Sequence, residues 1–166
     1  MLTQRIFADQ EQASTGTIRI DVSHLQIGDR AGICLFHDPY AMICVERTSK
    51  KGYQLLWKEK TIASGPSPDL SLVGRGENTG AKTIYFSPSK GKVRRGSIYL
   101  RASIRFGENK ARFYYSFDNK TWKQLGEDTQ QSFNLSVFVG SRFGIFCYAT
   151  KQQGGYADFD WFSTED

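Results

Sequence analysis

Apolar and polar residues alternate with a period of two through much of the chain. In residues 97–106 every second side chain is apolar, from Ile98 to Phe106, and the same period recurs in residues 17–22 and 111–117. Successive side chains of a β-strand point to opposite faces, so this period is typical of a strand with one buried face. The pattern therefore predicts three strands that each have one side in a core.

Other segments of strand length are apolar throughout or alternate less strictly. They comprise residues 2–7, 31–36, 40–47, 53–58, 84–86, 143–149 and 156–162. Turn signals separate the strands at intervals of about 8 to 12 residues, and no stretch has a helical period. The chain of 166 residues fits one domain, 1–166. We predict an all-β fold, a two-sheet antiparallel β-sandwich of the jelly-roll type.

The C-terminal stretch holds two strands that we expect to form a hairpin. Residues 143–149 and 156–162 are dense in aromatic and branched side chains, and Gly154 and Gly155 stand between them. Glycine accepts backbone angles that other residues avoid, which suits a tight reversal. This interpretation makes the two segments paired neighbours in one sheet.

Alternation assigns the two faces of the last strand. Phe159 and Trp161 fall on one face, and Asp158 and Asp160 on the other. Because a shift of one residue would move both carboxylates into the core, we expect this register to be fixed, with Trp161 buried against the opposite sheet.

The distribution of charge and the length of the apolar runs limit the expected partners of the chain. The net charge is +5, but the basic residues are spread along the chain without a nucleic-acid-binding motif, and no apolar run is long enough to cross a membrane. We predict neither a nucleic acid nor a membrane as partner.

The three cysteines are Cys34, Cys44 and Cys147, and they lie in strand interiors without metal-ligand spacing. This placement favours buried thiols, although Cys34 and Cys44 could pair.

No residue pattern indicates catalysis. His24 and His37 are far apart in sequence, and no known nucleophile or metal-protease motif occurs. Asp158 and Asp160 allow three interpretations: an anchor for a loop, part of a calcium site, or a carboxylate pair that hydrolyses a glycoside. We favour the anchor, and predict no catalytic residue, no metal ligand and no cofactor; a structural calcium ion remains the alternative.

One set of outward-facing side chains has the composition of a sugar-binding surface. Aromatic rings stack on the apolar faces of sugars, and arginine donates hydrogen bonds to hydroxyl groups. The strands 97–106 and 111–117 and the strand 143–149 contribute Tyr99, Arg101, Arg105, Arg112, Tyr114, Arg142, Phe146 and Tyr148. The alternative is cross-strand packing, or a surface that docks on another domain.

Five segments resemble a known family. They are LTQRIF (2–7), GTIRIDVSHLQIGDRAGICLF (16–36), YLRASI (99–104), ARFYYSFDNKTWKQLG (111–126) and FVGSRFGIFCYATKQQGGYADFDWF (138–162). They are similar to the C-terminal β-sandwich of glycoside hydrolase family 43 enzymes, which are β-xylosidases and α-L-arabinofuranosidases. The resemblance implies a concanavalin A-like jelly roll and a non-catalytic accessory module.

The same resemblance implies partners. In whole family 43 enzymes the sandwich packs on a five-bladed β-propeller that carries the catalytic acids, and related modules form the xylan-binding family 91. In several of these enzymes a phenylalanine of the sandwich enters the propeller's substrate pocket, and Phe138 matches its position. The expected partners are xylan-type polysaccharide or oligosaccharide and such a propeller. The alternative is a structural domain that stabilises the catalytic domain or its oligomer without affinity for sugar.

Overall fold

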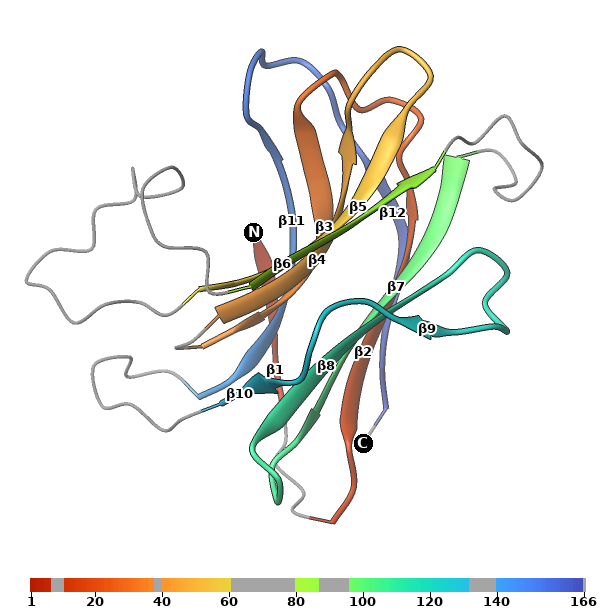
Figure 1. The fold of residues 1–166 in the computed structure, drawn as a ribbon. Coiled ribbons are helices and arrows are strands. Elements are labelled where there is room, and N and C mark those ends of the chain that lie inside the picture. The colour runs from red at the N-terminus through yellow and green to blue at the C-terminus, as the bar shows by residue number, and fades with distance from the viewer. Residues whose placement is uncertain (7–10, 38–39, 61–79, 87–95, 132–139, 166) are drawn as a thin grey trace, which may run out of the picture.

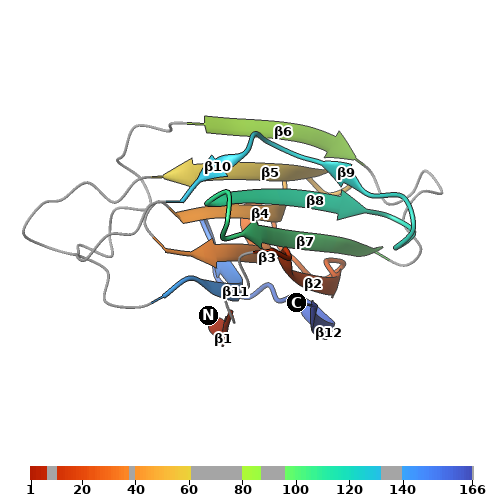
Figure 2. The same ribbon diagram turned by 90° about the horizontal axis from the view of Figure 1, so that it is seen from below.

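The computed structural model describes residues 1–6, 11–37, 40–60, 80–86, 96–131 and 140–165. These residues form two antiparallel sheets, one packed on the other (Figures 1 and 2), and contain no α-helix. The predicted all-β sandwich is confirmed. Among the described residues, no helix has the length and apolar character needed to cross a membrane.

Sheet A contains six strands in the order β1-β11-β3-β4-β5-β6. Their bounds are β1 (Leu2–Arg5), β3 (Asp29–Phe36), β4 (Tyr40–Arg47), β5 (Tyr53–Lys60), β6 (Gly80–Phe86) and β11 (Arg142–Ala149). Residues 2–7, one of the predicted strand segments, contain the edge strand β1, which pairs with β11, where Leu2 lies opposite Ile145.

Sheet B has the order β10-β8-β7-β2-β12, and β9 pairs with β8. The strands are β2 (Ser14–Asp21), β7 (Ser97–Arg105), β8 (Lys110–Ser116), β9 (Lys123–Gln124), β10 (Thr129–Gln130) and β12 (Asp158–Glu165). The strands with the clearest alternation, β2, β7 and β8, lie side by side at the centre of this sheet. Their apolar faces are buried, as the period of two predicted.

The core lies between the two sheets and is built from their inward faces. Sheet B contributes Ile18, Leu100 and Phe113, and sheet A contributes Ile43 and Phe143, all essentially inaccessible to solvent. Phe143 packs closely on Gly16, where an added Cβ atom would come 2.8 Å from the phenyl ring. The absence of a side chain at Gly16 therefore lets strand β11 of one sheet approach strand β2 of the other.

The expected hairpin of residues 143–149 and 156–162 is wrong. β11 pairs with β3 in sheet A, whereas β12 pairs with β2 in sheet B. The two glycines serve the crossing between sheets instead of a tight turn: Gly154 has φ +123°, and a Cβ atom on Gly155 would collide with Asp29. The crossing is held by backbone bonds from Thr150 to Gly28 and from Tyr156 to His24.

The predicted burial of Trp161 is also wrong. Phe159 lies opposite Ile20 and Trp161 opposite Arg19, so Asp160 is an extra residue at an irregularity in β12. A β-bulge of this kind reverses the faces of the residues that follow it. Phe162 consequently packs against the core, and Trp161 turns outward with 36% of its surface exposed.

Candidate functional site

The residues predicted to bind sugar lie on two different sheets. Tyr99, Arg101, Arg105, Arg112 and Tyr114 are on strands β7 and β8 of sheet B, whereas Phe146 and Tyr148 are on β11 of sheet A. Both groups point away from the core, because their neighbours along each strand are the core residues. The prediction of one shared platform is therefore wrong, and two outward faces have to be considered separately. Phe138 lies outside the described residues.

The outward side of sheet B gathers aromatic rings from three strands and from the turn after β8. We call it the aromatic face and define it by Tyr99, Arg101, Tyr114, Trp122 and Trp161. The rings of Tyr99 and Trp161 have centroids 6.1 Å apart and are tilted by 46°. The guanidinium of Arg101 lies over the ring of Trp122 at 4.1 Å, and Arg101 pairs across the strands with Tyr114. All five side chains are partly accessible to solvent.

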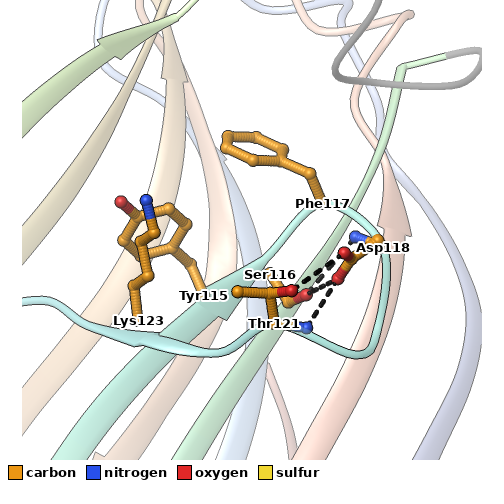
Figure 3. A pocket seen from close by; sticks show the side chains of 6 residues that line it. All are labelled: Tyr115, Ser116, Phe117, Asp118, Thr121 and Lys123. Carbon is orange, nitrogen blue, oxygen red and sulfur yellow. Dashed lines mark hydrogen bonds between the residues drawn. The ribbon is translucent and has the colours of Figure 1, made fainter.

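The sequence pattern did not identify Trp122 as a residue of this face; a turn after β8 positions it. Figure 3 shows this turn, in which the Asp118 carboxylate accepts hydrogen bonds from the backbone N–H group of Thr121 and from the hydroxyl of Ser116. The same carboxylate also accepts a hydrogen bond from the backbone N–H group of Lys120. These bonds, led by that from Thr121, hold the pKa of Asp118 well below its usual range. The turn returns the chain along β8, and Trp122 then falls on the outward side.

A hollow of about 310 Å³ lies beside the same turn (Figure 3). Tyr115, Ser116, Phe117, Asp118, Thr121 and Lys123 line it. The Asp118 carboxylate and the hydroxyl groups of Ser116 and Thr121 already bond to one another and to the backbone of the turn. A ligand entering there would have to compete with the bonds that fold the turn, so we do not assign it as a site.

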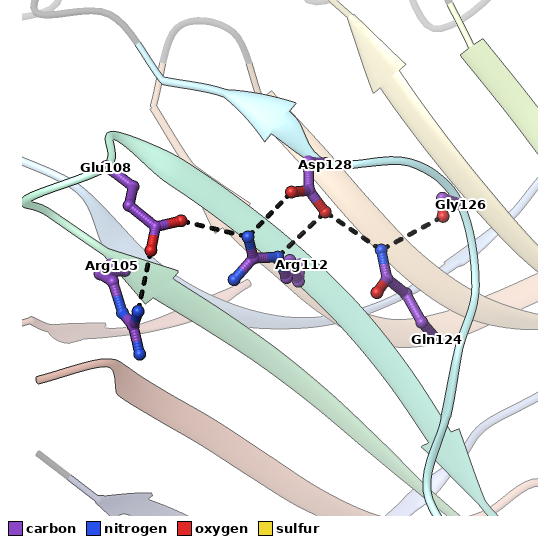
Figure 4. A network of polar contacts seen from close by, with 6 residues as sticks. All are labelled: Arg105, Glu108, Arg112, Gln124, Gly126 and Asp128. Carbon is purple, nitrogen blue, oxygen red and sulfur yellow. Dashed lines mark hydrogen bonds and ion pairs between the residues drawn. The ribbon is translucent and has the colours of Figure 1, made fainter.

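Two of the predicted arginine donors are engaged in ion pairs (Figure 4). Arg112 donates to both carboxylate oxygens of Asp128 at 3.0 and 2.9 Å, and also to Glu108 at 3.1 Å. Arg105 donates to the other oxygen of Glu108 at 2.8 Å, and Gln124 donates to Asp128. The network lies at one end of the aromatic face, next to the turn of β7 and β8.

The ion pairs lower the pKa of both acids, as expected for carboxylates beside arginine. The hydrogen bond from Arg105 lowers the pKa of Glu108, and that from Arg112 lowers the pKa of Asp128. Both pairs are open to solvent, where such contacts add little to stability. Their effect is instead to fix the arginine side chains, which leaves Arg105 and Arg112 fewer free donors than the sequence suggested.

The outward side of sheet A is more apolar. Cys34, Met42, Cys44 and Leu56 alternate with core residues along their strands and so point away from the core, yet each is buried. Burial raises the pKa of the Cys34 and Cys44 thiols to about 12. Both cysteines are free thiols, as is Cys147, for which the predicted burial is wrong because its side chain is exposed.

A polar group borders this apolar region. Arg30 and Glu46 form an ion pair at 2.6 Å, and Arg30 also donates to the hydroxyl of Tyr148 at 3.4 Å. The Tyr148 ring lies 5.8 Å from that of Phe146. Burial raises the pKa of Tyr148, against the opposing effect of Arg30. The outward side of sheet A therefore combines apolar surface with an ion pair that is largely shielded from water.

The two aspartates of the last strand have separate structural partners. Asp160 pairs with Arg19 at 3.0 Å, and Asp158 lies 3.5 Å from the Nδ1 atom of His24, whose ring stacks on Tyr156. These contacts join β12 to β2 and to the loop after it, in accordance with the interpretation as an anchor. Within the described part of the chain, no three acidic, histidine or cysteine side chains are grouped to hold a metal ion.

Comparison with known proteins assigns the family. The fold is that of a concanavalin A-like domain, and residues 1–165 match the family model of the β-xylosidase C-terminal concanavalin A-like domain. The chain belongs to this family, whose domains are the non-catalytic C-terminal part of glycoside hydrolase family 43 enzymes.

Individual relatives agree with this assignment. A β-xylosidase of Formosa agariphila is 32% identical over 164 residues, which are 98% of this chain and 22% of the relative. A bifunctional GH43-CE protein of Bacteroides eggerthii matches with 31% identity and a TM-score of 0.74 over 99% of this chain and 18% of its own.

An engineered family 43 hydrolase with endo-xylanase and exo-arabinofuranosidase activity matches with 26% identity and a TM-score of 0.71, over 98% of this chain and 30% of its own. The chain therefore spans less than a third of each of these relatives.

Proposed function

We propose that this domain is a carbohydrate-binding accessory module that holds a xylan-type glycan on the aromatic face of sheet B. The observation that supports the proposal is the grouping of Tyr99, Tyr114, Trp122 and Trp161 around Arg101 on one solvent-facing side. Relatives named as β-xylosidase and as an endo-xylanase suggest the type of glycan.

The energetics of sugar binding favour this face over the hollow beside the turn. Sugar hydroxyls are already hydrogen-bonded to water, so each exchanged bond contributes only about 1 kcal/mol. Stacking of the apolar ring face on an aromatic side chain removes surface from water and adds to this. A single face of this kind is expected to bind weakly, with Kd in the range of roughly 10 μM to 1 mM.

Affinity electrophoresis in gels containing soluble arabinoxylan, followed by titration calorimetry with xylohexaose, tests the proposal. Retardation and measurable heat are expected, and Trp122→Ala and Tyr114→Ala should each weaken binding without a large change in melting temperature. Tyr85→Ala is the matched control, because Tyr85 is 74% exposed on β6 of the other sheet. No retardation and no heat at millimolar xylohexaose would refute the proposal.

A second candidate function is docking on a catalytic domain, and the outward side of sheet A favours it. Cys34, Met42, Cys44 and Leu56 form an apolar strip there, beside Phe146. These four side chains are already shielded from solvent, so a partner surface would contact chiefly the partly exposed rings of Phe146 and Tyr148 that border them. The partner implied by the resemblance is the five-bladed propeller of a family 43 enzyme, whose substrate pocket Phe138 would complete.

The docking function has its own test. A propeller domain from a family 43 relative, produced separately, is mixed with this module and followed by analytical ultracentrifugation. Docking predicts a complex that Phe146→Glu weakens and Trp122→Ala does not. Failure to form a complex would refute docking and leave the glycan proposal to its own experiment.

A further inference from the structure

Arg101 occupies the middle of the aromatic face and is held in a fixed position. It lies between Thr17 on β2 and Tyr114 on β8 in one row across the sheet. Its Nε atom donates to the Thr17 hydroxyl at 2.9 Å, and its guanidinium stacks on Trp122 at 4.1 Å. Stacking uses the flat face of the guanidinium and leaves the N–H groups in its plane free to donate.

The other arginines of this side have carboxylate partners, whereas Arg101 has none among the described residues. Arg19 pairs with Asp160, and Arg105 and Arg112 share Glu108. The immediate neighbours of Arg101 on the outward face, across and along the strands, are Thr17, Tyr114, Tyr99 and Ser103, which are all uncharged. Apart from the bond to Thr17, no hydrogen bond of Arg101 is formed within the described part of the chain.

We propose that Arg101 binds a sugar carboxylate, so that the module prefers a xylan carrying uronic acid substituents over a neutral one. This inference rests on the proposed glycan-binding function of the same face. The guanidinium presents a planar pair of donors whose geometry matches the two oxygens of a carboxylate. Because Thr17 and Trp122 already fix the side chain, binding costs less conformational entropy than for a free arginine.

The surroundings suit the same ligand. Tyr99 and Tyr114 flank Arg101 and provide ring surfaces for the xylose units that carry the substituent. The nearby acids Asp128 and Asp160 are held by Arg112 and Arg19, so neither competes for Arg101 in the structure. The net charge of +5 favours the approach of an anionic polymer in general, but a specific carboxylate site predicts dependence on this one residue.

Titration calorimetry with two xylo-oligosaccharides of equal length, one neutral and one bearing a single glucuronic acid, tests the inference. The acidic ligand should bind about tenfold more tightly, as expected for a charge-assisted pair, and its advantage should shrink as salt rises. Arg101→Gln should remove this advantage, and Arg101→Lys should retain only part of it. Lys51→Gln, which removes a charge from an exposed turn of sheet A, should leave the ratio of affinities unchanged.

The outcomes separate the inference from the proposal beneath it. Equal affinity for both ligands would overturn the carboxylate site while leaving glycan binding intact, whereas absence of binding by either would refute both. An advantage that survives in correctly folded Arg101→Gln would also overturn the assignment to Arg101. Oligogalacturonate serves as a third ligand: binding as tight as that of the acidic xylo-oligosaccharide, and equally dependent on Arg101, would support the carboxylate site but overturn the preference for xylan.

Discussion

The contact between Phe143 and Gly16 gives a quantitative test of how the two sheets pack. Phe143 is 1% exposed, and its ring lies where a Cβ atom on Gly16 would stand, at 2.8 Å. Truncation of a buried phenylalanine to alanine removes its transfer free energy and leaves a cavity, so Phe143→Ala should lower the free energy of unfolding by about 3–5 kcal/mol. Gly16→Ala should cost about 1–3 kcal/mol, because the new methyl group collides with the ring.

The double variant distinguishes this contact from two unrelated defects. In Phe143→Ala with Gly16→Ala the new methyl group enters the space that the ring has left, so the combined cost should fall short of the sum by about 0.5–3 kcal/mol. Equilibrium unfolding in urea, monitored by tryptophan fluorescence, measures all three variants. Strict additivity, or a cost below about 1 kcal/mol for Phe143→Ala, would refute the described packing of β11 on β2.

Three further predictions concern the corrected register, an acid-dependent turn and the thiols. Trp161→Ala should cost less than the about 3–5 kcal/mol of a fully buried aromatic side chain in urea unfolding, because the ring faces outward and is 36% exposed, and Phe162→Ala should cost more than Trp161→Ala; the reverse order would contradict the bulge. Asp118→Asn should lower the melting temperature at pH 7. Since the folded-state pKa of Asp118 lies below its usual value of 3.8, that deficit should shrink as the pH falls below about 4, and a deficit unchanged at pH 2 would contradict the role of the turn. In the native protein Cys147, which is exposed, should react with a thiol reagent before the two buried cysteines; equally fast reaction of all three would contradict their burial.

Strand identity and burial could be predicted where alternation was strict. In β7 and β8 every second residue is apolar, and Leu100 and Phe113 are buried as expected. Alternation also separated the outward residues Tyr99 and Tyr114 from the core. Such local patterns depend on one strand at a time, which is why they can be read from the sequence.

The relation between strands could not be predicted in the same way. The chain crosses from sheet A to sheet B between β11 and β12, and this crossing depends on the close approach of Gly155 to Asp29. A pair of glycines is compatible with a hairpin as well as with a crossing, so the sequence pattern does not distinguish the two. The bulge at Asp160 shifts the faces of Trp161 and Phe162 without a signal in the pattern. These two features decided which aromatic residues share a face.

The tryptophans offer the most direct test of the central claim that the aromatic face of sheet B binds glycan. The chain has three, and each indole N–H gives its own signal in a ¹H–¹⁵N spectrum. Trp122 and Trp161 lie on the aromatic face, whereas Trp57 is 3% exposed in the core and serves as an internal reference. Titration with xylohexaose should shift the signals of Trp122 and Trp161 in a saturable manner and leave that of Trp57 in place. Signals that all stay unchanged at millimolar xylohexaose, or a shift confined to residues of sheet A, would contradict the account.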